Sequence, residues 1–273
     1  MVYVISFIFW LVFGSFISVL VWRIKNKEKW ILFGRSKCPK CWNALQPVDL
    51  VPIFSYIFLK WKCRYCWEKI SIIYPILELT TGLVFVFVSW LILQTGNIQV
   101  FLENWQYVVY GWVVAVFFVA LAFYDILFYE ISFVLVWILA VLLLIPQFLW
   151  IVGDWKLALL LALGGVVVFL GISFLRLKVR KIEGMWGWDA IGAAILGLLT
   201  PILMDILGLH YPAWLVFYIL IMMGFGLGAL VWLLGLFGKK MNFLSKLPFL
   251  PFMFGAVILF VIFGKEVLSR IIN

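Results

Sequence analysis

The stretch Ala120-Leu-Ala-Phe-Tyr-Asp125 closes an apolar run that begins near residue 106. A helix of roughly 20 mostly apolar residues is long enough to cross the hydrocarbon of a bilayer. Similar runs follow one another along a chain that is 67% hydrophobic, with a mean hydropathy of +1.20. The runs lack the alternation, in segments of ~10 residues, that is typical of a membrane β-barrel. The sequence therefore predicts an all-α polytopic membrane protein.

We expect about eight transmembrane helices, and the distribution of charge predicts their orientation. The segment between the first two, residues 23–69, holds 11 Lys and Arg against three acidic residues, which indicates a cytoplasmic loop. Counting from this loop places the N-terminus outside and 18 of the 21 basic residues inside. The expected spans are residues 2–22, 72–94, 106–124, 131–150, 156–175, 185–206, 212–236 and 248–264.

The net charge of +9 is explained by the contact of the protein with the membrane. Basic residues at the ends of cytoplasmic loops orient the helices and contact anionic lipid headgroups. We therefore expect membrane lipids, and no nucleic acid, as partners of the basic surface.

All four cysteines lie in the predicted cytoplasmic loop as two Cys-x-x-Cys pairs, with 21 residues between the pairs. This pattern is typical of a tetrahedral Cys₄ zinc site, and disulfides do not persist in the cytoplasm. Because cysteine sulfur would fill all four coordination positions of the metal, we expect a structural zinc whose binding helps to fold the loop. A redox-sensing loop is the alternative. The predicted ligands are Cys38, Cys41, Cys63 and Cys66.

Two aspartates, Asp125 and Asp189, lie at the boundaries of apolar runs. A carboxylate near the hydrocarbon costs several kcal/mol and marks a candidate functional site. The predicted topology puts both at the cytoplasmic ends of their helices, where they can meet at one depth. Paired carboxylates suggest aspartyl chemistry. The alternative is that both are structural, capping helices or pairing with lysines.

Several motifs resemble, in order and spacing, the type IV prepilin leader peptidase/N-methyltransferase family. The long cysteine loop is similar to that of its full-length branch, and the resemblance covers nearly the whole chain. The motifs are Gly14-Ser-Phe-Ile-Ser-Val-Leu-Val-Trp-Arg23, the two cysteine pairs, Asp49-Leu-Val-Pro52, Tyr74-Pro-Ile-Leu-Glu78, Asp125 and Glu183-Gly184-Met185…Asp189.

The resemblance implies an intramembrane aspartyl endopeptidase of the bacterial inner membrane. Such an enzyme cleaves the basic leader of type IV prepilins, or of pseudopilins in type II secretion, at the cytoplasmic face. Asp125 and Asp189 would be catalytic. Many full-length members then methylate the new N-terminus with S-adenosylmethionine, although no cofactor motif in this chain predicts that activity. We expect two domains, residues 1–71 with the first span and zinc loop, and residues 72–273 with the peptidase.

The resemblance also implies supporting roles near the proposed active site. Glu78 and Glu183 match acidic positions of the family, and we expect them to contact the basic leader or orient the aspartates. Helix capping or lysine pairing is the alternative for both. Gly184 and Gly187 match glycines of the second aspartate motif.

Tryptophan stands where the family usually has glycine. The second motif should read Gly-Met-Gly-x-Gly-Asp, but Trp186 and Trp188 occupy two of its glycine positions. The same replacement recurs at Trp10, Trp42, Trp61 and Trp67. We hypothesise that these six positions are UGA codons, which some bacterial lineages read as glycine. A degenerate, inactive paralogue and a real tolerance of tryptophan are the alternatives.

Two other classes of function remain open on the sequence. A catalytically inactive membrane scaffold of the same fold would bind prepilins without cleaving them. A transporter coupled to protons or metal ions would use the two carboxylates near the midplane of the membrane, whereas these aspartates lie toward one face.

Overall fold

The computed structural model describes residues 2–27, 34–93, 98–149, 154–180, 186–209, 211–237, 248 and 250–272. The described part is helical and has no strand, only the isolated β-bridges Lys37–Ala44 and Lys62–Lys69. The elements are α1 (Val2–Lys25), the 3₁₀ helix η1 (Pro47–Leu50), α2 (Phe54–Phe58), α3 (Ile73–Leu93), α4 (Ile98–Phe128), α5 (Phe133–Phe148), α6 (Trp155–Arg180), α7 (Trp186–Leu207), α8 (Ala213–Phe237) and α9 (Leu250–Ile272).

Each of the eight expected spans corresponds to one long helix, which is α1 or one of the helices α3 to α9. The all-α prediction is therefore confirmed. Within the described residues, five helices are long and apolar enough to cross a membrane by length and composition. They lie within α1, α3, α4, α7 and α8. The apolar parts of α5, α6 and α9 are shorter, at Phe133–Phe148, Trp155–Val168 and Leu250–Gly264.

The chain divides into two units, residues 1–123 and residues 124–273, with the division inside α4. The predicted domain boundary at residues 71/72 separates the zinc loop from the proposed peptidase, and it stays a prediction.

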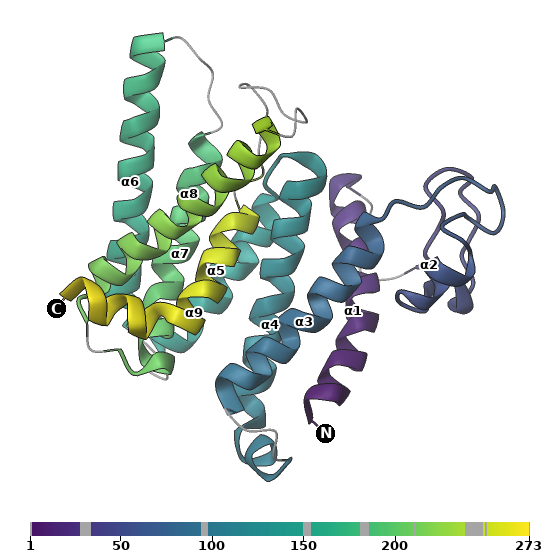
Figure 1. The fold of residues 1–273 in the computed structure, drawn as a ribbon, viewed down its shortest axis with the longest axis horizontal. Helices are drawn as coiled ribbons and strands as arrows, with labels where there is room; N and C mark the ends of the chain where they lie inside the picture. Colours follow the sequence, from purple (N-terminus) through teal and green to yellow (C-terminus); the bar gives the residue numbers. More distant parts are fainter. Residues whose placement is uncertain are drawn as a thin grey trace. The chain divides into compact units, whose positions relative to one another are not determined.

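In the first unit, α1 and α3 lie side by side (Figure 1). Gly14 lets the two backbones approach, because a Cβ added there would lie 2.7 Å from the Cα of Glu78. Small residues allow such close packing where lipid offers no hydrophobic drive for association. This contact brings the second half of α1 against the start of α3.

An aromatic cluster fills the same unit at the level of Trp10. The Trp10 ring stacks on Phe85, with centroids 3.7 Å apart, and meets Trp112 of α4 edge to face at 5.2 Å. The Trp112 indole N–H donates to Ser89 Oγ over 3.0 Å. The cluster joins α1, α3 and α4.

In the second unit, α6 and α7 make the closest helix pair. A Cβ on Gly197 of α7 would lie 2.6 Å from the Cα of Ala162 in α6, so the two helices touch backbone to backbone. The buried Gln147 connects α5 to α7, because its side-chain amide donates a hydrogen bond to the carbonyl of Leu198 over 2.8 Å.

Substituting Gly197 by Ala should therefore separate α6 from α7. Overpacking a close contact costs about 1–3 kcal/mol, more than the ~1 kcal/mol that alanine gains in helix propensity. We expect a lower midpoint of thermal unfolding in detergent. The matched control is Gly164→Ala in α6, since a Cβ there meets nothing within 4 Å. Equal midpoints for the two variants would contradict this packing.

Candidate metal centre and catalytic residues

Each Cys-x-x-Cys pair forms a small turn, here called a knuckle, and both are built in the same way. In the first, Cys38 N–H donates to Asn43 and Trp42 N–H donates back to the Cys38 carbonyl, over 3.0 and 2.9 Å. In the second, Cys63 N–H donates to Glu68 and Trp67 N–H to the Cys63 carbonyl, over 2.8 and 3.0 Å. A β-bridge closes each knuckle. The backbone thus presents four sulfurs from two equivalent turns.

The four sulfurs are arranged as a metal would require. All Sγ atoms lie within 4.8 Å of one another, and those of Cys38 and Cys66 are 3.9 Å apart. A tetrahedron with Zn–S bonds of about 2.3 Å has edges of about 3.8 Å, so the set fits zinc. The thiols are free, and Cys38 and Cys63 are buried. The fit supports the predicted ligand set.

The ionisation of the thiols also supports a metal site. A backbone hydrogen bond from Glu68 lowers the pKa of the Cys66 thiol, but burial and side-chain hydrogen bonds to Cys63, Cys41 and Cys38 raise it, to about 12. Thiols that oppose one another's ionisation become thiolates together when a cation lies among them.

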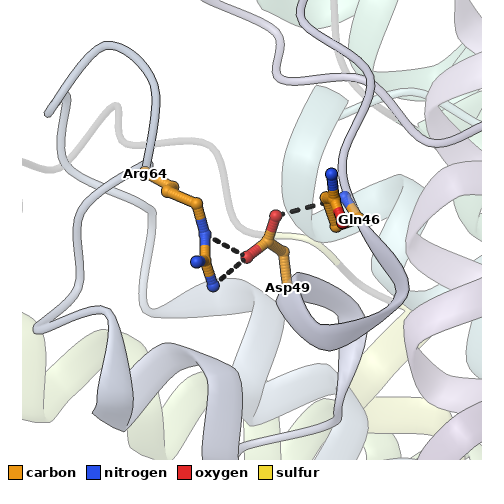
Figure 2. Close-up of polar contacts among 3 residues, drawn as sticks. All are labelled: Gln46, Asp49 and Arg64. Atoms are coloured by element: carbon orange, nitrogen blue, oxygen red, sulfur yellow. Dashed lines mark hydrogen bonds and ion pairs between the residues drawn. The ribbon is translucent and has the colours of Figure 1, made fainter.

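Asp49 of η1 holds the second knuckle, a role that the sequence motif alone did not reveal. Its Oδ1 accepts hydrogen bonds from the Arg64 guanidinium, with Nε 2.8 Å and an Nη 2.8 Å away, and its Oδ2 accepts from the Gln46 backbone N–H over 3.1 Å (Figure 2). The Asp49 side chain is 2% exposed, so this ion pair is largely withdrawn from water on the carboxylate side. Arg64 lies between Cys63 and Cys66, so the contact fixes the second knuckle against η1.

Three of the six tryptophans at expected glycine positions have a left-handed backbone. Trp42, Trp61 and Trp67 adopt φ of +59°, +61° and +60°. Residues with a Cβ rarely take this conformation, which costs them about 1–2 kcal/mol, whereas glycine takes it freely. The side chains of Trp42 and Trp67 are 64% and 74% exposed, so burial of the indole offsets little of that cost. The backbone here favours glycine.

The other three positions differ. Trp10 is buried in the aromatic cluster of the first unit, in a helix that needs no glycine conformation. Trp186 and Trp188 lie in the first turn of α7, and their side chains are outside the described part of the structure.

Asp125 lies near the end of α4 and is 7% exposed. Its Oδ2 accepts a hydrogen bond over 3.0 Å from the backbone N–H of Leu250, the first residue of α9. A helix start carries partial positive charge and unpaired N–H donors, so this contact stabilises a carboxylate. The contact also caps α9, which is one of the two alternative roles predicted for this residue.

The remaining predicted residues of the second motif are only partly visible. Asp189 belongs to the first turn of α7, but its side chain is outside the described residues, so its pairing with Asp125 stays a prediction. Gly187 lies in the same helical turn. Glu183, Gly184 and Met185 lie outside the described residues.

Glu78 is in α3 and is 8% exposed. Its Oε2 accepts the backbone N–H of Ile53 over 2.7 Å, and the side chain of Ser15 also hydrogen-bonds it. Ile53 has φ +62°, unusual for a β-branched residue and a sign of strain held by the surrounding structure. Glu78 thus ties α1, α3 and the turn before α2 together within the first unit.

Comparison with known proteins identifies the first part of the chain. Residues 8–92 match the family described as the bacterial peptidase A24 N-terminal domain. The matched residues are about a third of the chain, and they include both knuckles, Asp49 and Glu78.

Curated proteins match about a third of the chain. The prepilin leader peptidase/N-methyltransferase of Bacillus subtilis is 43% identical over 81 residues, 30% of this chain and 32% of the relative. Those of Vibrio cholerae and Myxococcus xanthus are 40% and 38% identical over 98 and 82 residues. These two matches cover 33% and 30% of this chain, and 39% and 24% of the relatives. The predicted family resemblance is confirmed over about a third of the chain, and the matches span less than two fifths of each relative. No solved structure matches the chain.

Replacing Cys41 by Ser should remove one ligand of the metal centre. We expect purified wild-type protein to contain about one zinc per chain and Cys41→Ser to contain far less, because a serine hydroxyl is a poor zinc ligand. Elemental analysis measures the content. Ser36→Ala, near the first knuckle but without sulfur, is the control. Full zinc content in Cys41→Ser would contradict the Cys₄ assignment.

Glycine at position 42 should stabilise the first knuckle through its backbone. Both Trp42→Gly and Trp42→Ala remove the indole, but only glycine relieves the left-handed φ. We therefore expect Trp42→Gly to exceed Trp42→Ala in stability by about 1 kcal/mol, measured by denaturant unfolding of the zinc-loaded protein. An alanine variant as stable as the glycine variant would remove this argument for glycine.

Proposed function

We propose that the chain is an intramembrane aspartyl endopeptidase that removes the leader of a prepilin or pseudopilin at the cytoplasmic face. The observation that carries this proposal is the match of residues 8–92 to the bacterial peptidase A24 N-terminal domain. The similarity to proteins named prepilin leader peptidase/N-methyltransferase supports it. The apolar helices support a multi-pass protein of the bacterial inner membrane. The proposed N-terminus is outside.

In the proposed reaction Asp125 and Asp189 act as a pair. Two neighbouring carboxylates share one proton, so the ionised one activates water while the protonated one donates to the scissile carbonyl. Support comes from Asp125, which is buried and oriented by the Leu250 N–H. Glu183 is proposed to meet the basic leader.

The metal in this proposal is structural. Zinc, when bound by Cys38, Cys41, Cys63 and Cys66, would link the two knuckles. The chain's own contact between Asp49 and Arg64 fixes the second knuckle against η1. Because four sulfurs complete a tetrahedron, the centre has no open position for water or substrate.

We further propose that the chain methylates the new N-terminus after cleavage. The printed names of the relatives, which include N-methyltransferase, support this second activity. S-adenosylmethionine is the proposed methyl donor.

Asp125→Asn and Asp189→Asn should each abolish cleavage of a synthetic prepilin in detergent. The assay uses protein with Trp186→Gly and Trp188→Gly, which restores the glycines expected in the second aspartate motif. Loss of the general base or acid should lower the rate by about 10²–10⁴-fold. Asp154→Asn, an exposed acid before α6, is the control. Unchanged processing by either aspartate variant would refute the mechanism.

A non-catalytic scaffold is the second candidate, favoured by tryptophans on both sides of Gly187 at the start of α7. A scaffold would bind prepilin without cutting it, even after both glycines are restored. The codons at positions 10, 42, 61, 67, 186 and 188 separate the two candidates. UGA there, with UGG at Trp22, supports the active peptidase; UGG throughout supports the scaffold.

A further inference from the structure

The short helix α2 turns an apolar face outward. Phe54, Ile57 and Phe58 stand at positions i, i+3 and i+4, so their side chains share one face of the helix. They are 59%, 58% and 80% exposed. The opposite face, with Tyr56, lines a cavity that is also lined by the second half of α1. An apolar patch that the chain itself leaves exposed marks a contact with a partner protein or with lipid.

The start of α2 is fixed at a level within the lengths of α1 and α3. Ile53, the residue before α2, donates its backbone N–H to Glu78 Oε2 over 2.7 Å. Glu78 lies five residues after α3 begins at Ile73, which is about 8 Å along the helix axis. Ser15, which hydrogen-bonds the same carboxylate, lies ten residues before α1 ends at Lys25, or about 15 Å from that end. As Figure 1 shows, α2 therefore lies level with α1 and not beyond its end.

The depth of α2 favours lipid over a partner protein. The candidate membrane spans of α1 and α3 are Ser6–Lys25 and Ile73–Leu93, so one surface of the membrane lies near the end of α1 and the start of α3. An interfacial helix buries its apolar face about 5–10 Å into the boundary between headgroups and acyl chains. The start of α2, about 8 Å below the start of α3, falls in that range. A water-soluble partner would have to enter the bilayer to reach this face.

The charge that follows α2 suits a membrane surface. Lys60 and Lys62 come directly after the helix and are exposed. Lysine side chains can lay their apolar stems along the acyl chains while the ammonium group reaches the headgroups. Anionic headgroups attract such residues. Trp61 between them is also exposed, but the three residues of α2 form the apolar face without this tryptophan, which stands at an expected glycine position.

We propose that α2 is an interfacial helix that anchors the loop between α1 and α3 in the membrane. Its apolar face enters the leaflet at which α1 ends and α3 begins, and Lys60 and Lys62 contact anionic headgroups. Because Cys63 follows Phe58 by only five residues, the anchor holds the second knuckle, and with it the metal centre, close to the membrane surface. The proposal requires α1 and α3 to cross the membrane, and it does not depend on peptidase or methyltransferase activity.

The test uses the full, zinc-loaded protein with Phe58→p-benzoylphenylalanine, a photoreactive aromatic residue, in vesicles of phosphatidylcholine and phosphatidylglycerol. After irradiation, mass spectrometry measures the yield of covalent lipid adducts. The matched control is Tyr56→p-benzoylphenylalanine, on the cavity-facing side of the same helix. We expect about tenfold more lipid adduct at position 58, which corresponds to the preference of one phenylalanine side chain for apolar surroundings.

Equal yields of lipid adduct at the two positions, or cross-links from position 58 to a second copy of the chain in place of lipid, would overturn the proposal. If the Phe58 variant does not fold, which its zinc content reports, Phe54→p-benzoylphenylalanine makes the same measurement on the same face.

The headgroup contact has its own readout. The yield at position 58 should be higher with phosphatidylglycerol than in vesicles of phosphatidylcholine alone, and Lys60→Gln with Lys62→Gln should remove that difference. Equal yields in the two kinds of vesicle would refute the role of the lysines. Because no step measures prepilin cleavage, the result is independent of the peptidase proposal.

Discussion

The cost of placing a carboxylate in an apolar protein is the constraint on which the described structure depends. Asp49, Glu78 and Asp125 are all at most 9% exposed, and a different kind of contact stabilises each carboxylate. Asp49 pairs with Arg64, Asp125 accepts the first N–H of α9, and Glu78 is held by Ile53 and Ser15. Each contact also fixes a segment of chain: the second knuckle, the start of α9 and the turn before α2.

The metal centre shows how a short loop without a large apolar core can still have a defined conformation. Two turns with the same hydrogen bonds bring four sulfurs within 4.8 Å, and an ion pair ties one turn to η1. Trp42 and Trp67 have a left-handed backbone because each residue follows a knuckle, at the point where the chain reverses direction. An exposed indole adds no packing that would compensate for the strain. Glycine is the residue that this geometry suits, and the hypothesis of reassigned codons gains support from backbone conformation that is independent of family motifs.

The metal centre and the proposed catalytic aspartates belong to different units of the chain. The four cysteines lie in the first unit, among the residues that match the A24 N-terminal domain, and both aspartates lie in the second. The two sites differ in how their acidic groups ionise. Cleavage needs two carboxylates that share one proton, whereas a Cys₄ metal site needs four thiols that lose their protons together when the metal binds.

The sequence by itself determined the helices and the metal ligands. Apolar runs of about 20 residues can satisfy their backbone only as helices in lipid, and two Cys-x-x-Cys pairs leave few alternatives to a metal site. It also singled out Asp125 and Glu78, although not their partners. Only the tertiary structure decided that Asp125 caps α9 by accepting the N–H of Leu250, 125 residues further along the chain. The same holds for the pairing of Arg64 with Asp49 and for the left-handed backbone at three tryptophans. The physical reason is that apolar periodicity and ligand spacing are local properties of a sequence, whereas a buried charge finds its partner wherever the fold brings a donor within about 3 Å.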